Sequence, residues 1–217
     1  LTGGIYFGEK ERLDDYAKDV CEYSTSEIQR ITKVAANLAQ QRKGKITSVD
    51  KANVMATSQL WRSVTTDYLK INYNNIELEH MLADAATMHL LSRPGDFDVV
   101  LADNLFGDIL TDEASLLTGS IGMIPSASLG NDNFGVYEPI HGSAPDIQGK
   151  ELANPCGIIL SVSMLLRQSL GLKEEASAID KAVESVLEDG IFTIDLSKDN
   201  FVSTVDMGNA VASKISA

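Results

Sequence analysis

The sequence contains only two cysteines, Cys21 and Cys156, and neither belongs to a CxxC pair. That count and spacing argue against a disulfide framework and against a thiolate zinc site, and they favour a reducing compartment. No basic segment followed by an apolar one opens the chain, so we expect a cytosolic location.

Long apolar runs and positive charges are also scarce. The most apolar stretch, residues 157–166, is interrupted by Ser161 and Ser163 and falls short of the roughly 20 residues that span a bilayer. Lys and Arg total 18 against 31 Asp and Glu, a net charge of −13 that repels phosphate backbones. We therefore expect neither membrane insertion nor nucleic-acid binding. A hydrophobic fraction of 44% is that of an ordinary globular protein.

The standard phosphate-binding motifs are missing. No two glycines are separated by a single residue, so GxGxxG does not occur. Gly3 and Gly8 have the spacing of a Walker A loop, but Glu9-Lys10 follows where Lys-Ser/Thr is needed. Any nucleotide must bind by another route.

Hydrophobic periodicity and capping signals predict alternating strands and helices, typical of an α/β protein. Residues 1–23 suggest extended segments or a protruding hairpin, and Ser24 with Glu27 forms a capping box that starts a helix ending before Gly44. Strand-like segments are predicted at 45–49, 76–79, 99–101 and 136–140. Further helices are predicted at 57–72, 83–91, 105–117, 155–170, 173–188 and 203–215. These strands are few for so many apolar helix faces, which indicates either an α-rich domain or a sheet completed by chain upstream of Leu1.

Three acids are candidate metal ligands. Asp108 and Asp112 are four residues apart on a predicted helix whose apolar neighbours suggest burial, where Mg²⁺ or Mn²⁺ would relieve their repulsion. The alternative is a solvated acidic turn. Asp84 lies among small apolar residues, four positions after His80, so a His–carboxylate site on one helix is conceivable; the alternative is a capped or surface acid.

Two further residues could move protons. Lys51 follows a predicted strand, where a partly dry cleft would let it act as a base, although a solvated lysine is the simpler interpretation. Tyr6 could donate a proton or merely pack in the N-terminal arm. The small polar loop 138–146, ahead of the helix opened by Asn154-Pro155, allows close approach of a ligand with anionic groups.

Several stretches together resemble the isopropylmalate branch of the β-decarboxylating (isocitrate/isopropylmalate) dehydrogenase family, in its order and at its spacing. They are residues 1–8, 49–54, 104–112, 119–129, 138–147 and 153–155. The resemblance implies a two-domain mixed-sheet α/β dimer that is not a Rossmann fold, with its first strands missing here. Residues 1–118 would form the dimerisation and substrate domain, with an arm near 5–23, and residues 119–217 would return to the cofactor domain.

The resemblance also implies site residues. Asp84, Asp108 and Asp112 match the family's metal ligands, and Tyr6 and Lys51 match its catalytic residues. Lys51 and Asp84 would serve the neighbouring subunit's active site. The NAD site would use Glu138, His141, Gly142, Ser143, Ala144, Asp146 and Asn154.

The implied reaction is NAD⁺-dependent oxidative decarboxylation of 3-isopropylmalate with Mg²⁺ or Mn²⁺, a step of leucine biosynthesis. The family's substrate-binding arginines have no counterpart in this sequence and would lie upstream of Leu1. We therefore expect a C-terminal part of a longer enzyme that is inactive alone. Tartrate/malate, isocitrate or homoisocitrate specificity remains an alternative, as does a non-catalytic, dimerising, metal-binding module.

Overall fold

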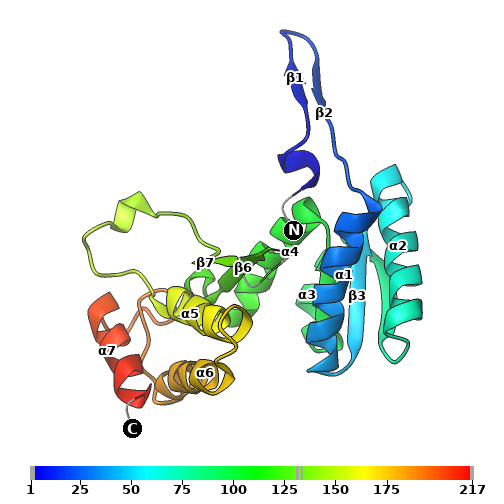
Figure 1. Cartoon of the computed structure of the whole chain (residues 1–217). Coiled ribbons are helices and arrows are strands. Elements are labelled where there is room, and N and C mark those ends of the chain that lie inside the picture. Colours follow the sequence, from blue (N-terminus) through cyan, green and yellow to red (C-terminus); the bar gives the residue numbers. More distant parts are fainter. Residues whose placement is uncertain (1–2, 131, 133, 216–217) are drawn as a thin grey trace. The chain divides into compact units, whose positions relative to one another are not determined.

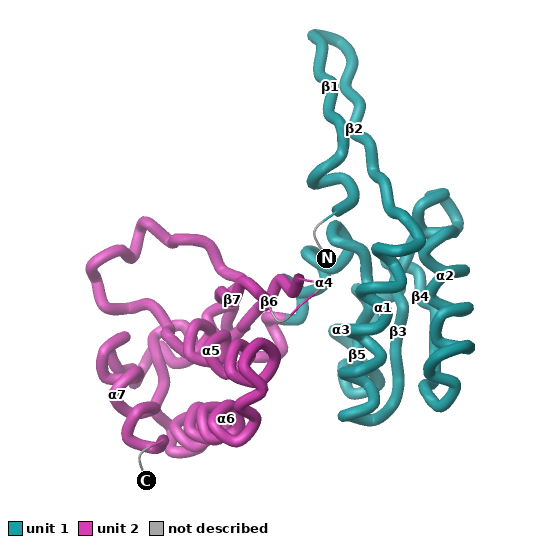
Figure 2. The backbone as a smooth tube through the Cα atoms, in the orientation of Figure 1, with its two compact units in different colours: residues 1–114 teal, residues 115–217 magenta. Residues whose placement is uncertain are grey.

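A computed structural model describes residues 3–130, 132 and 134–215 of the chain. Its contacts divide the chain into two compact units, unit 1 (Leu1–Ala114) and unit 2 (Ser115–Ala217), which Figure 2 colours separately. The assignment of a dimerisation domain and a cofactor domain to the two parts of the chain stays a prediction. None of the helices among the described residues is both long enough and apolar enough to cross a bilayer.

Unit 1 is built on a parallel three-stranded sheet in the order β4 (Glu77–Leu82), β3 (Lys45–Asp50), β5 (Val99–Ala102). The central strand is buried along almost its whole length, as expected for a parallel sheet covered on both faces. Helices α1 (Thr25–Gln40) and α2 (Ala56–Asn72) cover one face of this sheet. Helices α3 (Ala83–Ser92) and α4 (Asn104–Ser115) contribute to a second apolar cluster on the opposite face, around Val49.

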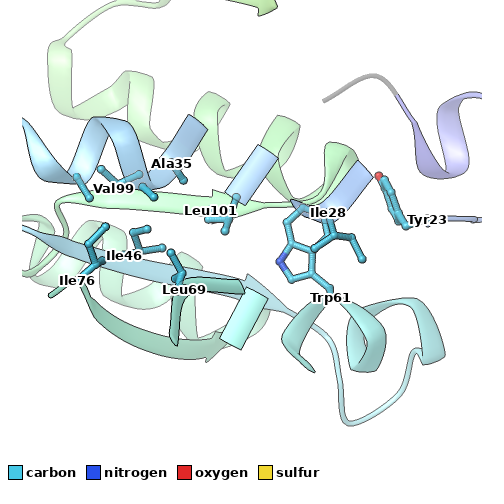
Figure 3. Close-up of a cluster of buried hydrophobic side chains, with 11 residues drawn as sticks. Tyr23, Ile28, Ala35, Ile46, Trp61, Leu69, Ile76, Val99 and Leu101 are labelled. Atoms are coloured by element: carbon cyan, nitrogen blue, oxygen red, sulfur yellow. The ribbon is translucent and has the colours of Figure 1, made fainter. Parts of the chain in front are cut away.

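The main core of unit 1 lies between the sheet and helices α1 and α2. Trp61 from α2 packs edge-on against Tyr23, with ring centroids 5.8 Å apart, and lies next to Ile28 (Figure 3). Ile46 and Leu101 belong to the same cluster. The predicted capping box at the start of α1 is confirmed: Ser24 Oγ accepts from the Glu27 backbone NH, and Glu27 Oε2 accepts from the Ser24 backbone NH at 2.7 Å.

The predicted hairpin near the N-terminus is present. Strands β1 (Lys10–Arg12) and β2 (Ala17–Asp19) pair antiparallel and project from the sheet and helices of unit 1 (Figure 1). The residues of both strands are exposed. A short 3-10 helix, Gly4–Tyr6, forms the base of this arm.

Unit 2 has an antiparallel hairpin of β6 (Pro125–Leu129) and β7 (Gly135–Pro139), packed against α5 (Cys156–Gln168). Helices α6 (Lys173–Glu188) and α7 (Thr204–Ile215) complete a core around Cys156, Val186 and Met207. Strand β6 was not predicted from the sequence, because Ser126 and Ser128 interrupt its apolar pattern. It forms through antiparallel pairing with β7. Ile158 and Val162 of α5 remain half-exposed among the described residues.

Two predicted segments need correction. The extended segment placed at 76–79 is strand β4 and runs to Leu82, because six residue pairs join it to β3. His80 therefore lies on a strand and Asp84 on a helix, so the idea of both on one helix is wrong. The helix carrying Asp108 is also less buried than expected. Leu110 is buried in the core cluster of that face, but the neighbouring Ile109 is 51% exposed. Asp108 and Asp112 are exposed as well.

Candidate active site

Lys51 and Asp84 form an ion pair at the carboxyl ends of β3 and β4. The register Asp50↔Leu82 brings the ends of these parallel strands side by side, so the residues just beyond them meet. Lys51 Nζ donates to Asp84 Oδ1 at 2.7 Å. This hydrogen bond is the main reason why the pKa of Asp84 lies below its usual value. Two residues predicted to lie in one site are thus in direct contact.

Tyr6 and Asp108 form a second pair. The Tyr6 hydroxyl donates to Asp108 Oδ2 at 2.6 Å, joining the base of the arm to α4. The bond to Asp108 and the negative charges of Asp108 and Asp112 raise the pKa of Tyr6. The hydroxyl, protonated at neutral pH as in any tyrosine, is in the state that a proton donor needs.

Tyr23 lies between the base of the arm and the start of α4. Its hydroxyl accepts a hydrogen bond from the backbone NH of Asn104 at the start of α4, at 3.1 Å. A Cβ on Gly4 would come within 2.2 Å of that hydroxyl oxygen, so only glycine fits there. Burial raises the pKa of Tyr23 to about 12. The sequence interpretation missed this residue, since nothing local distinguishes Tyr23 from an ordinary core aromatic.

The three acidic residues do not converge within one chain. No group of three His, Cys, Asp or Glu side chains lies close enough to hold a metal ion among the residues that the structure describes. Asp108 and Asp112 stand one turn apart on the exposed face of α4, and their carboxylates are the hard oxygen donors that Mg²⁺ and Mn²⁺ prefer. Their chemistry fits a divalent cation, and the completion of the ligand set by Asp84 of another chain, which the resemblance implies, stays a prediction.

His80 takes no part in this acidic set. Its Nε2 lies 2.8 Å from Thr66 Oγ1, and its Nδ1 lies 4.0 Å from Asp50. Burial, with a smaller effect of the Arg62 charge, lowers the pKa of His80 and favours the neutral ring. The conceivable metal site joining His80 to Asp84 is therefore not formed.

The predicted cofactor loop follows β7 in unit 2. Glu138 is exposed on β7, and residues 142–146 are exposed beyond it. Gly142 has open space at its Cβ position, and Ala144 adopts a left-handed conformation with φ 42°. His141 is half-buried, with Nδ1 2.9 Å from the Gly142 carbonyl oxygen. This open backbone and the exposed carboxylate of Asp146 fit a ligand that is bound through hydroxyl and amide groups.

Asn154 differs from the rest of the predicted cofactor residues. It is buried, its Oδ1 accepts from the Cys156 backbone NH at 2.9 Å, and its Nδ2 donates to Asp195 at 3.0 Å. The side chain thus fixes the start of α5. A contact of Asn154 with a cofactor stays a prediction.

Comparison with known proteins decides the family. A family model described as isocitrate/isopropylmalate dehydrogenase matches residues 1–211. This chain belongs to that family. The predicted fold class is confirmed as well: an isocitrate dehydrogenase from Methylococcus capsulatus superposes with a TM-score of 0.92 at 34% identity, covering 100% of this chain and 65% of that one. A β-decarboxylating dehydrogenase from Thermococcus kodakarensis gives 0.83 at 36% identity, covering 97% and 61%.

Similar curated proteins include 3-isopropylmalate dehydrogenases. The 3-isopropylmalate dehydrogenases of Rhodopirellula baltica and Heyndrickxia coagulans are each 50% identical to this chain, covering 100% and 99% of it. The chain spans 62% and 60% of the lengths of those two proteins.

Proposed function

We propose that this chain is the larger part of an NAD⁺-dependent 3-isopropylmalate dehydrogenase that acts in leucine biosynthesis. The observation that carries the proposal is the pairing of Lys51 with Asp84 and of Tyr6 with Asp108, at the positions where the family resemblance puts its catalytic and metal-binding groups. The names of the relatives at 50% identity favour isopropylmalate over isocitrate or tartrate.

The metal site we propose combines Asp108 and Asp112 of one chain with Asp84 of its partner in a homodimer. A bound Mg²⁺ or Mn²⁺ would lower the pKa of the substrate hydroxyl and stabilise the negative charge left after decarboxylation. Ile109, the neighbour of Asp108 on α4, is 51% exposed and would be covered by a partner chain on this face.

Lys51 is the proposed base. Its Nζ would take the proton of the C2 hydroxyl, directly or through one water, as hydride leaves for NAD⁺. In the isolated chain Nζ bonds Asp84, and Asp84 Oδ1 cannot serve the ammonium group and a divalent cation equally well.

Tyr6 is the proposed acid of the second half of the reaction. Its hydroxyl, already in contact with Asp108, would give a proton to the enol carbon after CO₂ leaves.

For the cofactor we propose NAD⁺ rather than NADP⁺. Asp146 lies exposed in the first turn of the short 3-10 helix Pro145–Ile147, where its carboxylate could accept from ribose hydroxyls and would repel a 2′-phosphate. Lys150 is the only cation in the loop 141–154.

Both cysteines are free thiols, which supports the proposed cytoplasmic location.

A chimaera tests the proposal. The segment of the Heyndrickxia coagulans enzyme that precedes its match to this chain is joined to residue 1, and NADH formation is followed with isopropylmalate, isocitrate, homoisocitrate and tartrate in the presence of Mn²⁺. We expect isopropylmalate to be preferred and the matched Lys51→Met chimaera to be inactive. Preference for another acid would overturn the assignment of isopropylmalate as the substrate. Mn²⁺ binding without turnover would favour the alternative of a non-catalytic, metal-binding module. The chain alone is expected to reduce no NAD⁺.

A further inference from the structure

Asp50, the residue before Lys51, is a buried acid with an unusually complete set of partners. It ends β3 and is only 1% exposed. Arg62 of α2 donates to both of its oxygens, from Nε to Oδ2 and from Nη2 to Oδ1, each at 2.8 Å. Asp50 Oδ1 also accepts from the Ala52 backbone NH at 2.9 Å. A buried carboxylate is costly unless its oxygens are satisfied in this way, so the pair must be retained together or lost together.

The same helix holds the backbone of Lys51. The Lys51 NH donates to the buried Ser58 Oγ of α2 at 3.1 Å. The Lys51 carbonyl accepts from the Val54 and Met55 NH groups, both at 2.9 Å. Lys51 therefore leaves β3 in a turn that is fastened on one side by Asp50 and on the other by α2.

His80 does not compete with Arg62 for Asp50. Its Nδ1 lies 4.0 Å from Asp50 Oδ2, beyond hydrogen-bond distance, and has no hydrogen-bond partner among the described residues. Because Nε2 bonds Thr66, the His80 ring lies beside Asp50 without bonding it. Arg62 is therefore the charge partner of Asp50.

We propose that Asp50 and Arg62 are positioning residues that fix the turn from which Lys51 reaches Asp84. They act through the backbone of Lys51 and Ala52, whereas Lys51 Nζ itself bonds Asp84 at 2.7 Å. The catalytic meaning of this pair rests on the proposed function, but the positioning effect does not.

The test measures the mobility of the Lys51 ammonium group by NMR in the 217-residue chain, without substrate, metal or cofactor. The informative variant is D50N/R62M, because it removes the buried charge and its partner together and leaves neither unpaired. We expect the order parameter of the Lys51 ammonium group to fall to the range of flexible groups, below about 0.6, and its contact with Asp84 to disappear. A dehydrogenase assay that fails leaves this result untouched, and the reverse also holds.

Lys45 is the internal control. It begins the same strand and its Nζ lies 2.9 Å from Glu79, so a general loosening of β3 would free both lysines, whereas loss of positioning frees only Lys51. The matched control variant is D180N/R167M, which removes an Arg–Asp pair of 2.6 Å in unit 2 and should change neither signal.

Three results would overturn the proposal: an unchanged Lys51 signal in folded D50N/R62M, a parallel loss at Lys45, or the same loss in the control variant. If D50N/R62M does not fold, Arg62→Lys replaces it, because lysine keeps the charge but cannot make two parallel bonds. The same loss, confined to Lys51, is then expected, and an unchanged Lys51 would refute the inference.

Discussion

The Tyr6 hydroxyl and the Asp108 carboxylate are 2.6 Å apart, although 102 positions separate them in the chain. The bond places a phenol that could give up a proton directly beside a carboxylate that could bind a cation. One chain thus contains two half-sites, Tyr6 with Asp108 and Lys51 with Asp84. We interpret them as complementary parts of one active site that is completed by a second chain.

Asp108→Asn should lower the pKa of Tyr6 toward its usual value. The hydrogen bond to Asp108, the partial desolvation of the phenol and the charges of Asp108 and Asp112 all raise this pKa, because they disfavour the phenolate. Since the folded-state pKa is raised, the interaction stabilises the fold at pH values below the unfolded pKa, and this contribution is lost as the pH rises through the folded one. Titration of ¹³C-labelled tyrosine, with Tyr6→Phe to assign the signal, measures the shift. An unchanged Tyr6 pKa would contradict the contact.

Local signals in the sequence sufficed for several elements. Ser24 and Glu27 cap a helix by bonds within four residues, and the apolar run at 99–101 identifies strand β5 of the sheet. Gly119, at φ 84°, ends the helical region at 104–118 where the sequence predicts its end. Each of these features depends on neighbours along the chain, which is why patterns alone predicted them.

Gly4→Ala should destabilise unit 1 by roughly 2–5 kcal/mol. Gly4 has φ 65°, and a methyl group there would lie 2.2 Å from the Tyr23 hydroxyl oxygen, so strain and overlap add. The fluorescence of Trp61, the only tryptophan, reports unfolding of the core that contains Tyr23. Gly95→Ala is the control, because its Cβ position is open; an equal loss of stability there would refute the steric explanation.

The missed features depend on contacts between distant segments. Strand β6 is ordered by β7, and β4 is lengthened by β3, which moved His80 from a predicted helix to a strand. Asp50 and Arg62 have no shared motif and meet only because α2 packs back over β3. The exposure of Ile109 could not be predicted either, because the sequence alone does not show which apolar residues of a helix stay outside the core.

Asn154→Ala should weaken unit 2 even without any cofactor. The change removes the bond to the Cys156 NH and a donor to Asp195, whose pKa is held below its usual value by such bonds despite burial. We expect a loss of about 1–3 kcal/mol, seen as faster amide hydrogen exchange in α5. Asn154→Asp keeps the acceptor for the Cys156 NH and should therefore lose less stability than Asn154→Ala. Unchanged exchange in the alanine variant would show that the cap is dispensable.

Asp146→Ala should instead leave stability unchanged and weaken cofactor binding. Asp146 is exposed, and its expected partners are the ribose hydroxyls. In the active chimaera we expect the KM for NAD⁺ to rise about tenfold, the value of one charged hydrogen bond, with a smaller effect on kcat. Discrimination against NADP⁺ should fall in parallel, because the repelling charge is gone. If the KM stays constant, Asp146 does not contact the ribose.

A mixing experiment tests whether the active site is shared. A Lys51→Met chimaera lacks the base given to its neighbour, and a Tyr6→Phe chimaera lacks its own acid, so each homodimer should be nearly inactive. After the two are unfolded together and refolded, a mixed dimer contains one site with both Tyr6 and Lys51 intact. Random pairing makes half of the dimers mixed, so roughly a quarter of the normal activity should return. Mixing Lys51→Met with Asp84→Asn is the control: both residues belong to one half-site, each mixed dimer has two damaged sites, and no recovery is expected. No recovery in the test mixture would show that each chain builds its site alone, and recovery in the control would show that Lys51 and Asp84 do not belong to one half-site.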